Sequence, residues 1–235
     1  MAMTDRTSLR MSAVLLFAGQ VVYILVTQFH AGVQANDHPA IFAAYAASGI
    51  WKTVHVGQFV CAAILLMGLL ALPFAVNADA GRARWAGRFG AVSAVVALAL
   101  YGVLQAVDGV GNKEVDDAWV NAPNGEKMAR FASAEAMRWL EWGVRSYHDF
   151  ALGIALLLIG AAVLQSRRVP RPIAYLMGLS GLTYLVQGWV VGADGFSATH
   201  TVLILVAWVL TLAWIIWLLI VAWRMQESEA RPLPA

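Results

Sequence analysis

The sequence predicts an all-α, polytopic membrane protein with six transmembrane helices, and three observations support that fold class. Of its 235 residues, 60% are hydrophobic and 13% are charged, whereas an ordinary soluble domain carries roughly 25% charged residues. Six apolar runs follow one another, most of them near the roughly 20 residues that cross a hydrocarbon core. Because the backbone in lipid must satisfy its own hydrogen bonds, each run should be a helix.

We expect residues 1–235 to form a single transmembrane domain. The expected spans are residues 11–30, 54–76, 85–107, 135–165, 172–191 and 199–223. The first follows Arg6 and Arg10, as a signal peptide would, but its apolar stretch is about twice the length of a signal h-region. The fourth is the longest, because no helix breaker separates its apolar part, Phe150–Gln165, from the polar residues upstream.

The charge pattern predicts the orientation. Ten of the 16 Lys and Arg residues lie in the N-terminus, the loops 77–84 and 166–171, and the C-terminus, or next to them, with only four of the 14 acids. The positive-inside rule then places both termini in the cytoplasm, as expected for a bacterial cytoplasmic membrane protein. The loops 31–52, 108–149 and 192–198 would face outward.

The outward loops are long, and short helices are expected on them. Asn36 or Asp37 would cap a helix within residues 36–50, with Pro39 in its first turn. Residues 110–134 are polar and are interrupted by the turn signal Ala122-Pro123-Asn124-Gly125. All five histidines also fall at or beyond the outward ends of the spans, which suggests a functional site there.

The fourth helix carries the strongest local signal. At about 100° per residue its polar side chains occupy one arc of roughly 140°, and opposite charges fall three or four residues apart. These side chains are Glu135, Arg138, Glu141, Arg145, His148 and Asp149. The arc is either a wet face of a protruding helix or a wall of a cavity. The short apolar part favours the cavity, because polar groups at membrane depth usually face the bundle interior.

The candidate residues follow from this placement. The catalytic candidates are Glu135, Glu141, Arg145, His148, Asp149 and Asp108. The candidates for binding a substrate are Trp139, Trp142, Trp51, Gln105, Gln187 and Tyr147. His55, His148 and His200 open successive even-numbered spans at matching depth, so they are candidates for a metal site.

Three segments, residues 38–59, 131–147 and 182–224, resemble an uncharacterised family of bacterial six-helix integral membrane proteins, a domain of unknown function. The resemblance implies a fold and a membrane location. It implies no activity and assigns no catalytic residue.

Three functions remain open at this stage. The first is an enzyme that uses carboxylate and histidine acid–base chemistry on a small apolar or isoprenoid-like substrate, in a cavity open to the outer leaflet. The second is a metal protein, or a haem protein with His55 and His148 as axial ligands. The third is an ion-coupled transporter or small-molecule receptor. The expected partners are the lipid bilayer and a small hydrophobic ligand; no nucleic-acid footprint is present, and an oligomer is compatible with the sequence.

Overall fold

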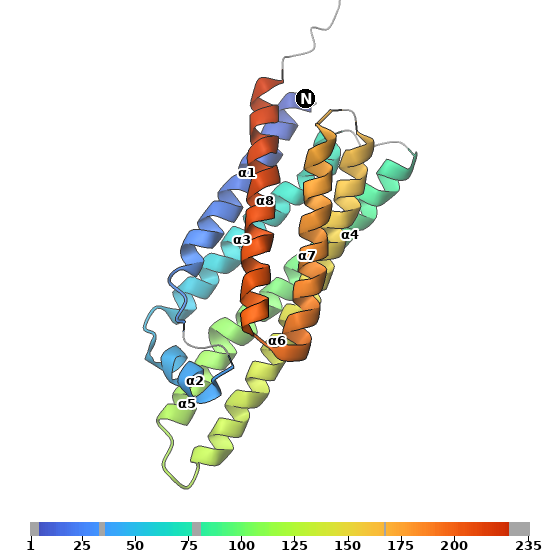
Figure 1. The fold of residues 1–235 in the computed structure, drawn as a ribbon. Coiled ribbons are helices and arrows are strands. Elements are labelled where there is room, and N and C mark those ends of the chain that lie inside the picture. The colour runs from blue at the N-terminus through green and yellow to red at the C-terminus, as the bar shows by residue number, and fades with distance from the viewer. Residues whose placement is uncertain (1–4, 33–35, 77–80, 167, 226–235) are drawn as a thin grey trace, which may run out of the picture.

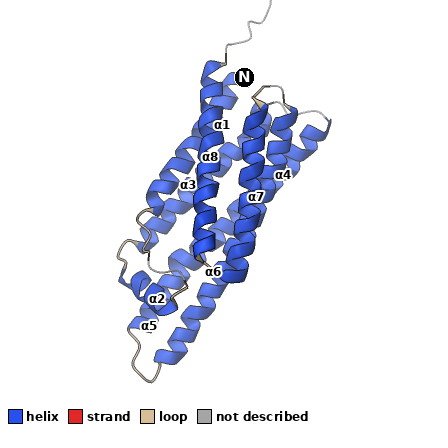
Figure 2. Ribbon diagram, viewed as in Figure 1, coloured by secondary structure: helices blue, strands red, loops and turns tan. Residues whose placement is uncertain are grey.

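A computed structural model describes residues 5–32, 36–76, 81–166 and 168–225. Every regular element in these ranges is a helix (Figures 1 and 2). In chain order the elements are α1 (Asp5–Thr27), α2 (His38–Ala47), α3 (Trp51–Ala75), α4 (Gly81–Ala106), the π-helix η1 (Val107–Asn112), α5 (Lys113–Val120), α6 (Lys127–Gln165), α7 (Arg171–Asp194) and α8 (Ala198–Arg224). Residues 77–80, 167 and 226–235, which entered the charge count, lie outside the described ranges.

Six helical segments in the described chain are long and apolar enough to cross a membrane. They coincide with the six predicted spans, so the all-α, six-helix prediction is confirmed. The segments form one bundle, in which α6 packs along both α4 and α7, α1 packs along α3, and α8 contacts α7 and α1 (Figure 1). The ends of α1 and α8 that lie near the chain termini are on one side of the bundle, and α2 and α5 are on the other.

Glycines allow α6 and α7 to approach closely. Gly153 on α6 faces Gly181 on α7, and a Cβ on either residue would lie within 2.8 Å of the other's carbonyl oxygen. Small residues at such crossings are typical of helix packing in membranes, where backbone proximity replaces the hydrophobic driving force.

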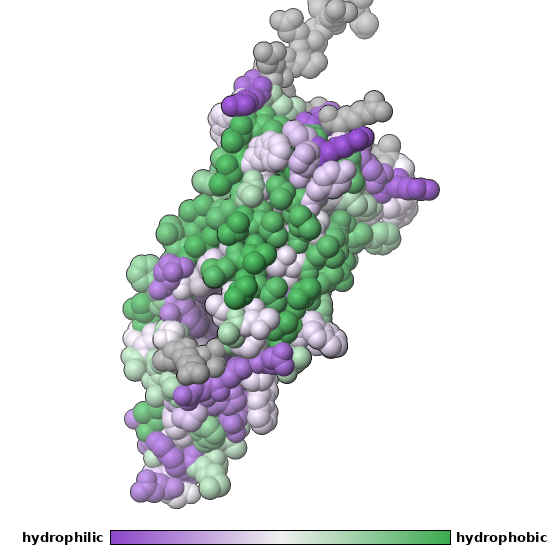
Figure 3. All heavy atoms as spheres, viewed as in Figure 1, coloured by the Kyte–Doolittle hydropathy of each residue, from purple (hydrophilic) through white to green (hydrophobic). Residues whose placement is uncertain are grey.

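The outer surface of the bundle is apolar. Figure 3 shows a broad hydrophobic band between two hydrophilic ends. Large apolar side chains of the spanning helices are exposed, such as Phe74, Trp189 and Val209. So large a contiguous apolar surface would be unstable in water and indicates contact with lipid. Near the chain termini, Arg10 lies over the ring of Trp223, the kind of pair found at a membrane interface.

The segment 108–149, for which the sequence predicts short helices followed by the start of the fourth span at residue 135, is largely helical. The prediction of a long fourth helix is confirmed, and that helix begins earlier than residue 135. The helix α4 continues through η1 and α5 to Val120, and α6 begins at Lys127. Together they form a hairpin that extends the bundle beyond its apolar band. The helical turns before residue 135 are polar and therefore show no apolar periodicity in the sequence. Ion pairs such as that of Lys113 with Asp117, 3.0 Å apart, stabilise them instead.

The helix α2 packs onto this hairpin, as the predicted short helix on the first outward loop. The side chain of Asp37 accepts a hydrogen bond from Ala40 N and caps the helix. At the other end, Lys113 Nζ donates to the carbonyl oxygens of Tyr45 and Ala46 in the last turn of the helix. The buried apolar cluster between α2 and the hairpin holds Ile41, Phe42, Tyr45, Trp51 and Ala134.

Candidate functional site

A cavity of about 310 Å³ extends into the bundle from the end that carries α2. Every membrane-spanning helix contributes to its wall, and Ile41 and Tyr45 of α2 also line it. Figure 3 shows a hollow between α1 and α8 at this level, below the apolar band. A volume of this size is at the lower end of the range for small-molecule sites.

The cavity is elongated along the bundle axis. On α6 its wall runs from Arg138 to Leu152, and on α3 from Gln58 to Leu66. At 1.5 Å per residue the α6 stretch corresponds to roughly 20 Å. We call the part of the cavity nearest α2 its outer level, and the part deepest in the bundle its inner level. Polar side chains line the outer and middle levels, and leucines line the inner level.

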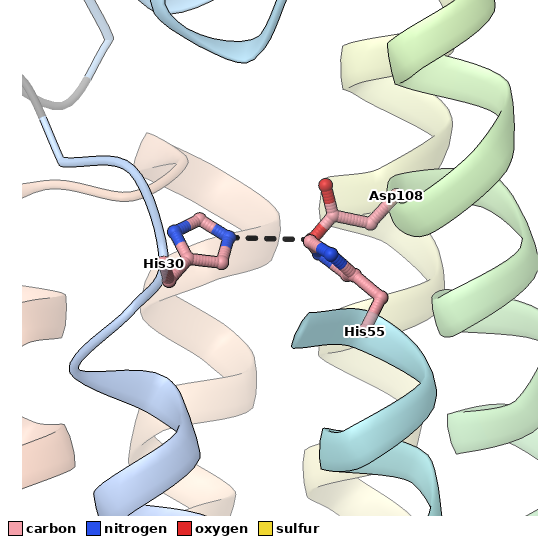
Figure 4. Close-up of side chains that lie close together, drawn as sticks. All are labelled: His30, His55 and Asp108. Carbon is pink, nitrogen blue, oxygen red and sulfur yellow. Dashed lines mark ion pairs between the residues drawn. The ribbon is translucent and has the colours of Figure 1, made fainter. Parts of the chain in front are cut away.

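Three potential metal ligands meet at the outer level of the cavity. They are His30, which follows α1, His55 on the first turns of α3, and Asp108 in η1 (Figure 4). The Asp108 Oδ2 atom lies 3.0 Å from His55 Nε2 and 3.9 Å from His30 Nε2. All three donor atoms lie within 4.8 Å of one another.

Backbone hydrogen bonds fix the orientation of both imidazole rings. His55 Nδ1 lies 2.8 Å from the Trp51 carbonyl oxygen, and His30 Nδ1 lies 2.9 Å from that of Ala31. Because a carbonyl oxygen only accepts, each Nδ1 carries the proton. Nε2 of each ring then faces Asp108 Oδ2, to which it donates an N–H when the ring is protonated; in the neutral ring its lone pair is available to a cation held between the two. This is the arrangement in which proteins hold metal-binding histidines.

The π-helix η1 positions the carboxylate of Asp108. Trp51 Nε1 donates to the Asp108 carbonyl oxygen at 2.8 Å, a group displaced by the wider helical turn. Asn112 Nδ2 donates to Asp108 Oδ1 at 3.2 Å, which leaves Oδ2 to face the histidines. Single π-helical turns within α-helices occur frequently at functional sites.

A second polar group is attached to the first through Asn112. Its Nδ2 atom also donates to Glu141 Oε2 at 2.7 Å, so one amide links the two carboxylates. Arg138 Nη1 donates to the same Glu141 oxygen at 2.6 Å and to the Tyr45 hydroxyl at 3.0 Å. Burial raises the pKa of Tyr45 above its usual range, so its hydroxyl stays neutral.

Asp116 on α5 adds a further buried carboxylate near this group. Its side chain is fully buried, and neither oxygen has a hydrogen-bond partner among the described residues. The charges of Arg138, Glu141 and Asp108 all act on it. An ionised carboxylate that is buried without a partner is costly, so Asp116 is stable here in its protonated form or beside a cation.

A third polar group lies at the middle level. Arg145 Nε donates to Asp149 Oδ2 at 3.0 Å, and its Nη2 donates to Gln187 Oε1 at 2.9 Å. Asp149 and Gln187 are fully buried behind it. Across the cavity, the Tyr101 hydroxyl donates to the Tyr23 hydroxyl at 3.0 Å.

Four of the six predicted catalytic residues line the cavity, namely Asp108, Glu141, Arg145 and His148. Asp149 lies behind the wall, where it holds Arg145. Glu135 is not among the lining residues and instead lies 3.0 Å from His38, which joins α2 to α6. The polar arc on α6 is therefore a cavity wall over most of its length.

The predicted substrate-binding residues have three different placements. Gln105 lines the cavity, whereas the fully buried Gln187 and Trp51 support residues that line it. The tryptophans and the tyrosine of α6 lie elsewhere. Trp139 and Tyr147 are 55% and 68% exposed on the outer surface, and Trp142 packs against His38.

The predicted His55, His148 and His200 set is not brought together within the described residues; the one metal-ligand group there contains His30 and Asp108 with His55. His148 Nδ1 instead lies 2.9 Å from the Ala97 carbonyl oxygen, and its ring packs on Tyr101. His200 packs on Phe196. Matching depth on three helices was insufficient, because the helices present these histidines to different neighbours.

Sequence reasoning missed His30 as a ligand, and Asn112 and Tyr45 as supporting residues. His30 shares the outward placement of all five histidines, which was the one available signal. No short spacing links it to His55 or Asp108, because the three residues come from separate elements.

Comparison with known proteins identifies the family of the chain. A family model described as "Domain of unknown function (DUF4386)" matches residues 11–222. The chain belongs to this family. No curated protein and no solved structure matched it. The resemblance to a six-helix family of unknown function is therefore confirmed, and the match covers every residue named in the cavity. Because the family description states no activity, the chemistry must be argued from the geometry.

Proposed function

We propose that this member of the family is a membrane-embedded metalloenzyme, in which His30, His55 and Asp108 bind a divalent cation that activates water toward a lipophilic ester. The observation that carries the proposal is the convergence of two oriented Nε2 atoms on one carboxylate oxygen. Zinc binds such atoms at about 2.0–2.1 Å in tetrahedral geometry, which separates neighbouring ligands by about 3.3 Å. The separations of 3.0 and 3.9 Å bracket that value.

The charge of the buried groups also supports a cation. Four buried carboxylates and two arginines occupy the polar groups described above. They are Asp108, Asp116, Glu141, Asp149, Arg138 and Arg145. With Asp116 protonated and the histidines neutral, the formal charge of this set is −1, which a bound cation would offset. Uncompensated charge at membrane depth is unfavourable, so the cation would stabilise the fold as well as act in the reaction.

The site has an open side for a reacting molecule. Both His30 and Asp108 line the cavity, so a fourth ligand position would point into it, as in catalytic zinc sites. Metal-bound water becomes a nucleophile near neutral pH because the cation lowers its pKa. Glu141 also lines the cavity, and its Oε2 atom is held by Asn112 and Arg138. We assign it to accept the proton that the water releases.

The remaining steps follow from ester chemistry. The hydroxide would add to the carbonyl carbon, the ester C–O bond would break, and the leaving alkoxide would take the proton back from Glu141. The carboxylic acid that forms would lose its proton to water, so the products are carboxylate, alcohol and one proton, and no oxidant or reductant is needed. The leucines of the inner wall, such as Leu65, Leu66 and Leu152, suit the hydrocarbon part of the substrate.

The orientation inferred from the charges completes the proposal. With both termini in the cytoplasm of a bacterial cell, the metal site would face the outer leaflet. The hollow between α1 and α8 lies at the lower edge of the apolar band (Figure 3), so a substrate dissolved in the bilayer could enter from the membrane interface. The alternative of metal-free acid–base catalysis by the same groups predicts the same substrate class but no bound metal.

Metal analysis separates these alternatives. The purified protein, loaded with Zn²⁺ and dialysed, should retain about one zinc per chain by mass spectrometry. His55→Ala and Asp108→Asn should each lose most of it, because each removes one of three ligands. His200→Ala serves as the control and should retain the metal, since this histidine packs on Phe196 instead.

Activity is measured on the same proteins with p-nitrophenyl esters of increasing acyl length. Hydrolysis should disappear with chelator and return with Zn²⁺. Wild-type protein that retains no zinc, or an Asp108→Asn protein that retains as much as the wild type, would refute the metal site. Metal binding without hydrolysis of any ester would refute the reaction class and leave the site itself intact.

A further inference from the structure

The middle level of the cavity contains a binding group that the proposed hydrolysis does not use. Arg145 lies four residues beyond Glu141 on α6, or about 6 Å further into the bundle at 1.5 Å per residue. Its side chain lines the cavity, as do those of Tyr23, Tyr101 and His148. A charged residue held at this depth is costly and usually marks a functional path.

Arg145 is fixed in place but retains free donors. Its Nε and Nη2 atoms are bonded to Asp149 and Gln187, at 3.0 and 2.9 Å. These are its only hydrogen bonds to side chains in the described residues, and Nη1 takes part in neither. Because guanidinium has five N–H donors in a rigid plane, the unused ones are presented to the cavity in a defined direction.

The charge around Arg145 selects the kind of group it can bind. Asp149 is fully buried and already forms an ion pair with Arg145, so the pair is formally neutral. An anionic ligand would add an uncompensated negative charge at membrane depth, where such charge is unfavourable. A neutral oxygen acceptor would use the free N–H groups without that cost.

We infer that Arg145 binds a neutral oxygen, such as a carbonyl, ether or hydroxyl oxygen, on a lipophilic molecule that occupies the cavity. The inference deepens the proposed function, because it assigns the substrate class as an uncharged lipid-like molecule with a polar group within its chain. The hydrocarbon beyond that group would contact Leu65, Leu66 and Leu152. The Tyr101 ring, 4.9 Å from that of His148, lines the same part of the cavity.

The test measures binding and does not depend on the metal. Metal-stripped protein in nanodiscs is titrated with methyl ω-bromododecanoate, and separately with ω-bromododecanoate. Bromine quenches tryptophan fluorescence on contact, and Trp208 lines the cavity. The Trp208→Phe protein identifies the part of the quenching that arises there.

The ester should bind the wild type more tightly than the carboxylate does. Arg145→Met should weaken ester binding about tenfold or more, the effect of losing a hydrogen bond to a charged donor. Arg130→Met is the matched control. Arg130 is exposed at the hairpin tip beside Glu126, and its replacement should leave binding unchanged.

Two results would overturn the inference. One is equal ester affinity in the wild-type and Arg145→Met proteins; the other is tighter binding of the carboxylate than of the ester. If Arg145→Met does not fold because Asp149 is left unpaired, the charge-balanced Arg145→Met/Asp149→Asn protein replaces it, with the same expected loss. A failure of zinc binding would refute the proposed function without changing any of these binding results.

Discussion

Replacement of Arg138 by Met should destabilise the protein strongly, and the loss in the free energy of unfolding can be estimated from the contacts of Arg138. Arg138 and Glu141 form an ion pair of 2.6 Å, and their side chains are 3% and 2% exposed. The same guanidinium donates to the Tyr45 hydroxyl at 3.0 Å. The substitution keeps an apolar stem of similar length, so its main effect is to remove the charge and its donors.

The expected loss comes mainly from the partner left behind. Breaking a buried ion pair by removing one partner costs about 3–5 kcal/mol, because the other charge stays buried without compensation. Glu141 would keep Asn112 as its one donor and would lie near the negative charge of Asp108. We therefore expect a fall in the free energy of unfolding of about 3–5 kcal/mol.

A double-mutant cycle isolates this effect. The free energy of unfolding is measured by reversible SDS titration in mixed micelles for the wild type, Arg138→Met, Glu141→Gln and the double variant. Since replacing both partners of a buried pair is often nearly neutral, the double variant should be more stable than Arg138→Met. A loss below about 1 kcal/mol in Arg138→Met, or a double variant that loses the sum of both single effects, would contradict a buried, mutually dependent pair.

Two further predictions concern topology and packing. In a Cys61→Ala background, an impermeant thiol reagent applied to intact cells should label a cysteine at Asn124 and not one at Gln165. These residues lie at opposite ends of α6, and the charge asymmetry places the Gln165 end inside; the opposite labelling would reverse the orientation. Gly153→Leu should lower the free energy of unfolding by about 1–3 kcal/mol, because a Cβ there meets the backbone of α7. A Cβ at Gly143 on the same helix meets no atom within 4 Å, so Gly143→Leu should change stability little.

Local patterns in the sequence were sufficient for the fold class. Each spanning helix depends on an apolar run within one segment, and the Asp37 cap of α2 depends on adjacent residues. The helical periodicity of α6 also correctly grouped Glu141, Arg145 and His148 on one wall. These features depend on contacts between residues close in the chain, which a sequence displays directly. The bounds of the helices before residue 135 in the polar hairpin were not predicted, because their turns lack the apolar signal.

The candidate metal centre was decided by the tertiary structure. His30, His55 and Asp108 come from the end of α1, the start of α3 and the π-helix after α4. Their convergence depends on how far each helix is rotated and shifted against its neighbours, and no spacing in the chain encodes that. The sequence by itself determined that six helices cross a membrane and that polar residues collect at one end. Only the packing of those helices decided which histidines face Asp108, because ligand geometry is set to within an ångström by contacts between distant segments.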